Sequence, residues 1–183
     1  MILVTTTRHA TPPVRRLAKE LAWVLGYARR INRGKMSMNE VALLAQSMRA
    51  SRVIIVGRGL HGNPAGVSFL KISDDGTSEQ ILSLRLRGVV FSRVRNRPKT
   101  PETKLPVVSI GSSEEYGEDI ALAFDTVYLG RYSLEDLRSF TSYSRVIAVE
   151  RVESKGITLV LKFLEMGEPI GPKLLVRKIK TYF

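Results

Sequence analysis

The chain has 183 residues, of which 44% are hydrophobic and 25% charged, the composition of an ordinary globular protein. Its longest apolar stretches are far shorter than the roughly 20 residues that cross a bilayer, and no secretory signal precedes the first strand-like segment. We therefore expect a soluble intracellular protein. The absence of cysteine excludes disulfides and cysteine-ligated zinc or iron–sulfur sites, and two histidines are too few for a histidine-rich metal centre.

The net charge of +12 is the strongest compositional signal. Residues 1–100 hold 18 basic and 5 acidic side chains, whereas residues 101–183 hold 11 basic and 12 acidic ones. Arginine supplies 19 of the 29 cations, and its planar guanidinium suits phosphate and base contacts better than lysine does. This asymmetry predicts a polyanionic partner that is engaged mainly by the first half of the chain.

Hydrophobic spacing in the first half predicts strands separated by two helices. Thr11 is expected to cap the first helix, which begins with a proline pair, carries an apolar stripe through Leu25 and ends at Gly26. A capping box from Ser37 to Glu40 opens the second helix. The predicted strands cover residues 2–6, 28–32, 53–56, 67–72 and 81–87.

Residues 92–106 contain three prolines and no apolar periodicity, so we expect a linker over 92–104 between a basic half, 1–91, and a second half, 105–183. The second half is expected to repeat the order of the first, with strands over 106–111, 127–130, 146–152, 157–164 and 173–180. Its helices follow the capping segments 112–115 and 133–136. Their expected apolar faces are Ile120, Ala123, Phe124 and Val127 in one helix and Leu134, Leu137 and Phe140 in the other. Both halves read β-α-β-α-β-β-β, which predicts an α/β fold with mixed sheets.

The glycine-rich segment 57–66 matches no phosphate-binding motif. It lacks the Lys-Ser or Lys-Thr of a P-loop, and Pro64 interrupts the helix that a dinucleotide fingerprint requires. We interpret the segment as a flexible turn beside a sheet edge, with a loop that has no partner as the alternative. The side chains that this turn would present are Arg58, His61 and Asn63.

Clustered arginines favour a groove for an RNA backbone. The segment "YARRINRGK" gathers four cations around a short strand and its turn. In "ILSLRLRG" the period of two turns Leu82, Leu84 and Leu86 toward the core and places Arg85 and Arg87 on the opposite face. Further candidates lie off the stripe of the first helix, at Arg15, Arg16 and Lys19, and in the linker, at Arg93, Arg95, Arg97 and Lys99.

Catalytic signals are weak. Glu114, Glu115, Glu118 and Asp119 cluster closely enough for a metal-dependent nuclease, but acidic residues are also favoured at a helix N-terminus by the helix dipole alone. No serine or cysteine nucleophile motif accompanies His61. Trp23 falls on the polar side of the first helix, where it would stack on a base or a partner protein, or else close the rim of the core.

The segment "ILVTTTRHATPPVRRLAKELAWVLGYARRINRGK" resembles the start of Brix-domain ribosome-biogenesis proteins, with Arg30 to Gly34 as the most specific part. The segment "EPIGPKLLVRKIK" resembles the closing motif of that family. The similarity spans nearly the whole chain and implies a single Brix domain, 1–183, most similar to the stand-alone archaeal members. Between the two end segments the match is loose, and residues 92–104 have no counterpart.

This resemblance implies two halves that are each like the anticodon-binding domain of class II aminoacyl-tRNA synthetases. It also implies binding to ribosomal RNA precursors during subunit assembly, without enzymatic activity. The family's RNA-contact roles would fall on Arg30, Asn32, Arg33 and Gly34, and on Gly171, Pro172 and Lys173. For the last three residues, a turn that leads into a strand is the alternative.

We therefore expect a monomeric, chaperone-like factor that holds a precursor rRNA segment in a productive fold, assists rRNA processing, needs no cofactor or metal and resides in the cytoplasm (the nucleolus in a eukaryote). Ribosomal proteins and other assembly factors are further expected partners, whereas a membrane or a small-molecule substrate is not expected. The alternative is a protein-interaction scaffold whose acidic segment 114–119 docks a basic ribosomal protein. The expected RNA contacts are Arg8, Arg15, Arg16, Lys19, Arg29, Arg30, Asn32, Arg33, Gly34, Lys35, Arg58, His61, Arg85, Arg87, Arg93, Arg95, Arg97 and Lys173.

Overall fold

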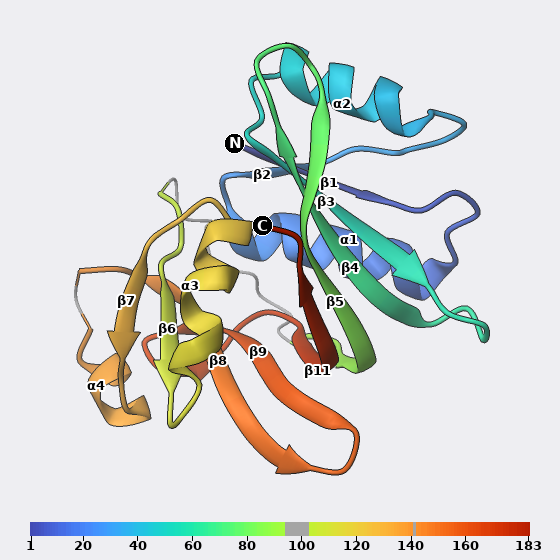
Figure 1. The fold of residues 1–183 in the computed structure, drawn as a ribbon. Helices are drawn as coiled ribbons and strands as arrows, with labels where there is room; N and C mark the ends of the chain where they lie inside the picture. The colour runs from blue at the N-terminus through green and yellow to red at the C-terminus, as the bar shows by residue number, and fades with distance from the viewer. Residues whose placement is uncertain (94–102, 141) are drawn as a thin grey trace.

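The computed structural model describes residues 1–93, 103–140 and 142–183. The first half contains β1 (Ile2–Thr6), α1 (Pro12–Leu25), β2 (Ala28–Arg30), α2 (Met38–Ser47), β3 (Arg52–Arg58), β4 (Pro64–Ile72) and β5 (Ser78–Val90) (Figure 1). The second half contains β6 (Val107–Ile110), α3 (Glu114–Ala123), β7 (Tyr128–Arg131), α4 (Leu134–Arg138), β8 (Arg145–Ser154), β9 (Ile157–Glu165), the two-residue β10 (Glu168–Pro169) and β11 (Lys173–Thr181). The predicted α/β fold of two similar halves is confirmed.

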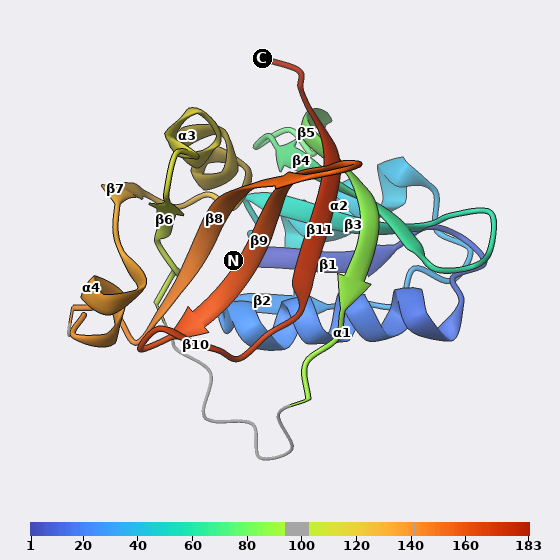
Figure 2. The same cartoon turned by 90° about the horizontal axis from the view of Figure 1, so that it is seen from below.

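One continuous sheet runs through both halves. Among the described residues its strand order is β2-β1-β3-β4-β5-β11-β9-β8-β6-β7, with β10 beside β9. Within each half the first three strands are parallel and the later ones antiparallel, so the expected mixed pairing is present. The antiparallel pair of β5 and β11 joins the halves edge to edge (Figure 2). Each half thus has the same internal order, related to the other by an approximate two-fold axis at this pair.

Helices cover both faces of the sheet. α1 and α3 contribute to one large apolar cluster that includes Ile2 and Val4 of β1. α2 packs with Leu3 in a second cluster on the opposite face, and α4 packs in a third cluster through Leu137. Burial on both faces explains why residues 2–4 of β1 and 53–56 of β3 are unbroken apolar runs in the sequence. No helix within the described ranges is long and apolar enough to span a membrane.

Two buried arginines link the halves in a reciprocal way. Arg52, the first residue of β3, donates from Nε and Nη2 to the carbonyl oxygen of Leu122 near the end of α3, at 3.3 and 3.2 Å. Arg145, the first residue of β8, donates from Nη1 to the carbonyl oxygen of Val24 near the end of α1, at 3.3 Å. Each half therefore places a cation at the negative end of the other half's first helix.

A carboxylate accompanies each of these arginines. Glu165 lies 3.1 Å from Arg145, and Asp125 lies 3.6 Å from Arg52. Burial alone would raise the pKa of Asp125, but hydrogen bonds from Lys104 and Ser51 and the nearby positive charges outweigh it and lower the pKa. The ionised form of Asp125 is therefore stabilised by the fold.

The predicted helix starts are correct in position, and Ser37 and Ser133 cap their helices with their side chains, whereas Thr11 and Ser113 do not. Ser37 Oγ accepts the amide of Glu40, which completes the expected capping box. The hydroxyl of Thr11 instead donates to the carbonyl of Gly62 in the β3–β4 loop. Ser113 likewise donates to the carbonyl of Val149 at 2.7 Å and makes no cap. Both hydroxyls serve long-range contacts that local sequence does not show.

The predicted apolar faces of α3 and α4 include residues that lie outside the helix or are exposed to solvent. α3 ends at Ala123, and Asp125 then adopts a positive φ of 53°, which turns the chain and leaves Val127 55% exposed. Leu134 is 45% exposed because α4 has only 5 residues, whereas Leu137 is buried. The predicted linker, 92–104, falls mostly outside the described residues.

Candidate nucleic-acid interface

Ion pairing differs sharply between the two halves. Of the arginines and lysines in residues 1–93, only Arg16 and Arg52 form an ion pair within the described residues. In the second half, the cations that pair with a carboxylate are Lys104, Arg131, Arg138, Arg145, Arg151 and Lys162. Most of the basic excess of the first half therefore has no carboxylate partner among the described residues and is available to an external anion.

Several of these free cations line a hollow at the carboxyl ends of β1 and β2, called here the β1–β2 hollow. Its volume is about 510 Å³. The carboxyl ends of parallel strands are where open α/β sheets bind their ligands. The lining residues are Thr6, Thr7, His9, Ala10, Arg15, Arg30, Asn32, Arg33 and Gly34. Five of the predicted contacts thus come together here.

The turn after β2 holds these side chains in place. Thr5 Oγ1 donates to the carbonyl of Ile31 at 3.2 Å, and Arg33 Nε donates to that of Met36 at 3.1 Å. Gly34 adopts a positive φ of 54°, a conformation in which a side chain would be strained. The turn therefore depends on its glycine for backbone shape.

Positive charges crowd each other around this turn. Arg8 donates to the carbonyl of Lys35 at 3.2 Å, and both residues border a smaller hollow that shares His9 and Gly34 with the first. Partial burial and the charge of Arg8 lower the pKa of Arg33. A bound anion would relieve this repulsion.

A second basic hollow, the β5 hollow, lies beside the β3–β4 loop and has a volume of about 430 Å³. Arg85 and Arg87 of β5 reach it as the alternation predicted. Leu82, Leu84 and Leu86 are buried, although Leu86 also lines the hollow. His61 also lines it, from the loop 59–63. The Thr11–Gly62 hydrogen bond joins this loop to the start of α1, which borders the β1–β2 hollow.

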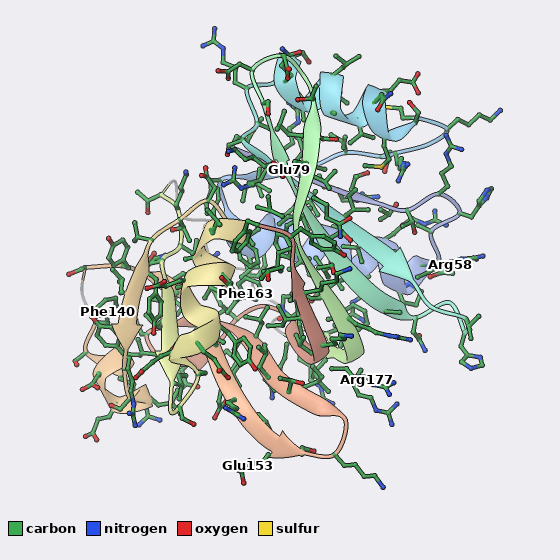
Figure 3. All side chains as sticks on the ribbon, in the orientation of Figure 1. Arg58, Glu79, Phe140, Glu153, Phe163 and Arg177 are labelled. Atoms are coloured by element: carbon green, nitrogen blue, oxygen red, sulfur yellow. The ribbon has the colours of Figure 1, made fainter. Side chains whose placement is uncertain are left out.

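Arg177 of β11 completes the β5 hollow, and sequence reasoning missed it. Figure 3 shows Arg177 pointing outward beyond the ends of β5 and β11, and Arg58 at the end of β3. The register of β11 against β5 shifts between Val176 and Lys178, so Arg177 lies at an irregularity of the strand. The pairing of β5 with β11 spans the two halves, and no local pattern in the sequence signals it.

Other predicted contacts lie outside both hollows. Arg16 donates to Glu20 at 2.9 Å and stacks 4.3 Å over the ring of Phe91, so these contacts hold its side chain against the protein. Exposed positions outside the hollows are Lys19, Arg29, Arg58 and Arg93, and Lys173 is partly exposed. Arg95 and Arg97 lie outside the described residues, as does Lys99.

The Gly-Pro of the closing motif packs in the interior. A Cβ on Gly171 would lie 2.8 Å from Val24 Cγ2 and 3.0 Å from Phe163 Cβ, and Pro172 is buried. The structure thus favours the folding role for these two residues over RNA contact. Trp23 is partly buried against the main core, with the Arg145 guanidinium 5.1 Å from its ring, which favours the rim position.

The acidic segment 114–119 is partly neutralised. Glu115 pairs with Arg151 at 3.2 Å and Glu114 with Arg131 at 3.9 Å. Within the described ranges, no group of three or more histidine, aspartate or glutamate side chains is placed to hold a metal ion.

No protein-family model matches the chain. A probable Brix domain-containing ribosomal biogenesis protein from Aeropyrum pernix is 27% identical over 177 residues, covering 96% of this chain and 94% of the relative. One of the same name from Methanothermobacter thermautotrophicus is 28% identical over 180 residues, covering 98% and 99%. This chain is a homologue of archaeal Brix-domain proteins.

Solved structures agree with that relationship. The crystal structure of a probable ribosomal biogenesis protein from Aeropyrum pernix K1 matches with a TM-score of 0.80 and 27% identity, over 97% of this chain and 95% of that one. The fold also matches Mil, an archaeal Imp4-like protein, with a TM-score of 0.73 and 24% identity over the full length of both. The Brix-domain resemblance read from the two end segments is confirmed, whereas the individual RNA contacts stay predictions.

Proposed function

We propose that this Brix-domain homologue is a non-catalytic, cytoplasmic ribosome-biogenesis factor that binds precursor rRNA with the basic surface of its first half. The main support is the contrast in ion pairing: guanidinium groups, nearly all from the first half, line two hollows without carboxylate partners among the described residues. The archaeal relatives are named ribosomal biogenesis proteins, and these names are the reason that we propose this process. The chain would act by holding an RNA segment in a productive fold.

Salt dependence is the first test, because each neutralised phosphate releases counterions. If about six phosphates of single-stranded RNA are engaged, the slope of log affinity against log salt should be near −4, from about −0.7 per phosphate. The measurement is fluorescence anisotropy with a labelled single-stranded RNA between about 50 and 200 mM salt. An affinity that does not change with salt would overturn the proposal.

A matched pair of double variants tests which half binds. Arg85→Gln with Arg87→Gln removes two unpaired cations of the β5 hollow and should reduce the slope by about 1.4. Arg131→Gln with Arg138→Gln removes the same charge from exposed cations that already face carboxylates, and should leave the slope unchanged. Equal effects of the two double variants would show that net charge alone, and not the first half, governs binding.

Crosslinking in cells of the source organism, followed by sequencing of the attached RNA, tests the process. We expect a sharp peak in one region of an rRNA precursor. Reads spread evenly over all RNA would identify a generic polyanion binder and would move the interpretation to the scaffold that docks ribosomal proteins.

A further inference from the structure

Two buried polar atoms in the β1–β2 hollow have no hydrogen-bond partner in the part of the chain that the structure describes. Among the described residues, the buried side-chain nitrogens and oxygens without a hydrogen bond are Thr7 Oγ1 and Arg30 Nε. Both residues line this hollow. An unsatisfied buried polar group costs about 1–3 kcal/mol, so buried polar groups in proteins are nearly always paired. Two of them in one hollow indicate an external partner that completes their hydrogen bonds.

The lining determines the charge of that partner. Arg30 is held in place because its Nη2 donates to Asn32 Oδ1 at 2.8 Å, which leaves Nε free. Arg15 is fixed by a 3.1 Å bond from its own Nε to the carbonyl of Ala10, and Arg33 is fixed through its Nε as described above. None of the described residues that line the hollow is acidic. The partner is therefore an anion with several acceptor oxygens.

The start of α1 contributes little to this site by itself. Its first two residues, Pro12 and Pro13, have no amide hydrogen to donate. The donors that bind the anion are therefore side chains, namely a threonine hydroxyl and guanidinium groups. Guanidinium and hydroxyl groups around one point are the donors that bind phosphate.

The second half supplies an internal comparison. Arg131 ends β7 as Arg30 ends β2, and α3 occupies the place of α1 in the repeated order. There the cation faces a carboxylate of the protein itself, because Glu114 in the first turn of α3 lies 3.9 Å from Arg131. In the first half no acidic residue lies in the first turn of α1. The second half thus places its own carboxylate beside the arginine that ends its short strand, whereas the first turn of α1 offers none to Arg30.

We propose that the β1–β2 hollow is a binding site for a phosphate group of a nucleotide, with Thr7 Oγ1 and Arg30 Nε as its buried donors and Arg15 and Arg33 as its flanking cations. The volume of about 510 Å³ leaves room for atoms beyond the phosphate itself. The site rests on the proposed function, in which that phosphate belongs to RNA: an internal diester of the backbone or a terminal monoester.

The first experiment measures inorganic phosphate binding by ¹H–¹⁵N NMR, at constant ionic strength against chloride. We expect saturable shifts of the Arg30 Nε–H signal and of amides around Thr7. Thr7→Val and Arg30→Lys each remove one buried donor while keeping shape or charge, and each should weaken binding about tenfold, as loss of one charge-assisted hydrogen bond does. Arg29→Lys is the matched control, since Arg29 is exposed and points to the other face of β2.

Stability measured without phosphate separates binding from folding. Because the Thr7 hydroxyl is unpaired, Thr7→Val should leave the melting temperature unchanged or raise it while binding falls. A variant that loses stability and binding together would indicate a structural role and overturn the assignment of Thr7. Non-saturable shifts, or equal binding by Arg30→Lys and Arg29→Lys, would overturn the site.

Two RNA oligomers that differ only in a 5′-phosphate or 5′-hydroxyl distinguish the sources. Arg30→Lys weakening both oligomers equally would assign the site to a backbone diester, and weakening only the phosphorylated one would assign it to a terminal phosphate. If RNA binding persists and Arg30→Lys changes neither, the site is refuted and the proposed function stands. If the chain binds no RNA, the proposed function fails, and the inorganic phosphate titration still decides the site.

Discussion

Arg145→Met removes the buried guanidinium with which β8 holds the end of α1. The variant loses the hydrogen bond to the Val24 carbonyl, the contact over the Trp23 ring and the ion pair with Glu165. A hydrogen bond to a charged group contributes about 1.5–3 kcal/mol. The ion pair adds less, because the Glu165 side chain is 28% exposed and regains water when Arg145 is removed. We expect a loss of about 3 kcal/mol in the free energy of unfolding, or roughly 6–12 °C in Tm for a chain of this length.

Urea unfolding measures the loss, and hydrogen exchange shows where it arises. Because Arg145 belongs to the second half and α1 to the first, amides near the end of α1 should lose protection although the substitution is in β8. Arg151→Met is the control, since it breaks an exposed pair with Glu115 and should cost no more than about 0.5 kcal/mol. A loss below about 1 kcal/mol for Arg145→Met, or exchange confined to β8, would refute the reciprocal link.

Three further outcomes follow from packing, capping and charge. Gly171→Ala places a Cβ 2.8 Å from Val24 Cγ2 and should cost about 1–3 kcal/mol by thermal melting; an unchanged Tm would contradict the close contact. Ser37→Ala removes the hydroxyl of the capping box formed with Glu40 and should lower the free energy of unfolding by about 1 kcal/mol. Hydrogen exchange should then be faster at the first amides of α2, and unchanged exchange would argue against the cap. The pKa of Asp125 is lowered from its ordinary value of 3.8, so its contribution is complete above that pH and is lost as pH falls below it. Asp125→Asn should therefore flatten the acid limb of the stability profile, and an unaltered limb would exclude this carboxyl as its source.

Local patterns predicted most of the elements because their causes are local. The spacing from Val14 to Leu25 and the Ser37 capping box need only neighbouring residues to be interpreted, and the alternation of Arg85 and Arg87 with leucines correctly gave their exposed face. The clustering of Arg30 and Arg33 is visible in the sequence, but the hollow that they line is not.

What could not be predicted depends on contacts between distant segments. Arg177 joins the β5 hollow only because β11 pairs with β5 across the halves. Thr11 has the sequence of a helix cap, yet its hydroxyl bonds the loop at Gly62, 51 residues away. Buried arginines such as Arg52 look like surface charges in a sequence, because nothing local distinguishes a cation that meets a distant helix end.

The reciprocal arginines and the β5–β11 pair make the junction of the halves resemble the interface of a dimer whose subunits share one polypeptide. Each half supplies the arginine that bonds the end of the other half's first helix, so neither half alone keeps all of its contacts. Fragments 1–93 and 103–183 should consequently behave as complementing subunits, poorly folded apart and associating when mixed. In such an arrangement the second half can fill its own anion position with Glu114 and still keep its place, because the first half needs its strand and its arginine.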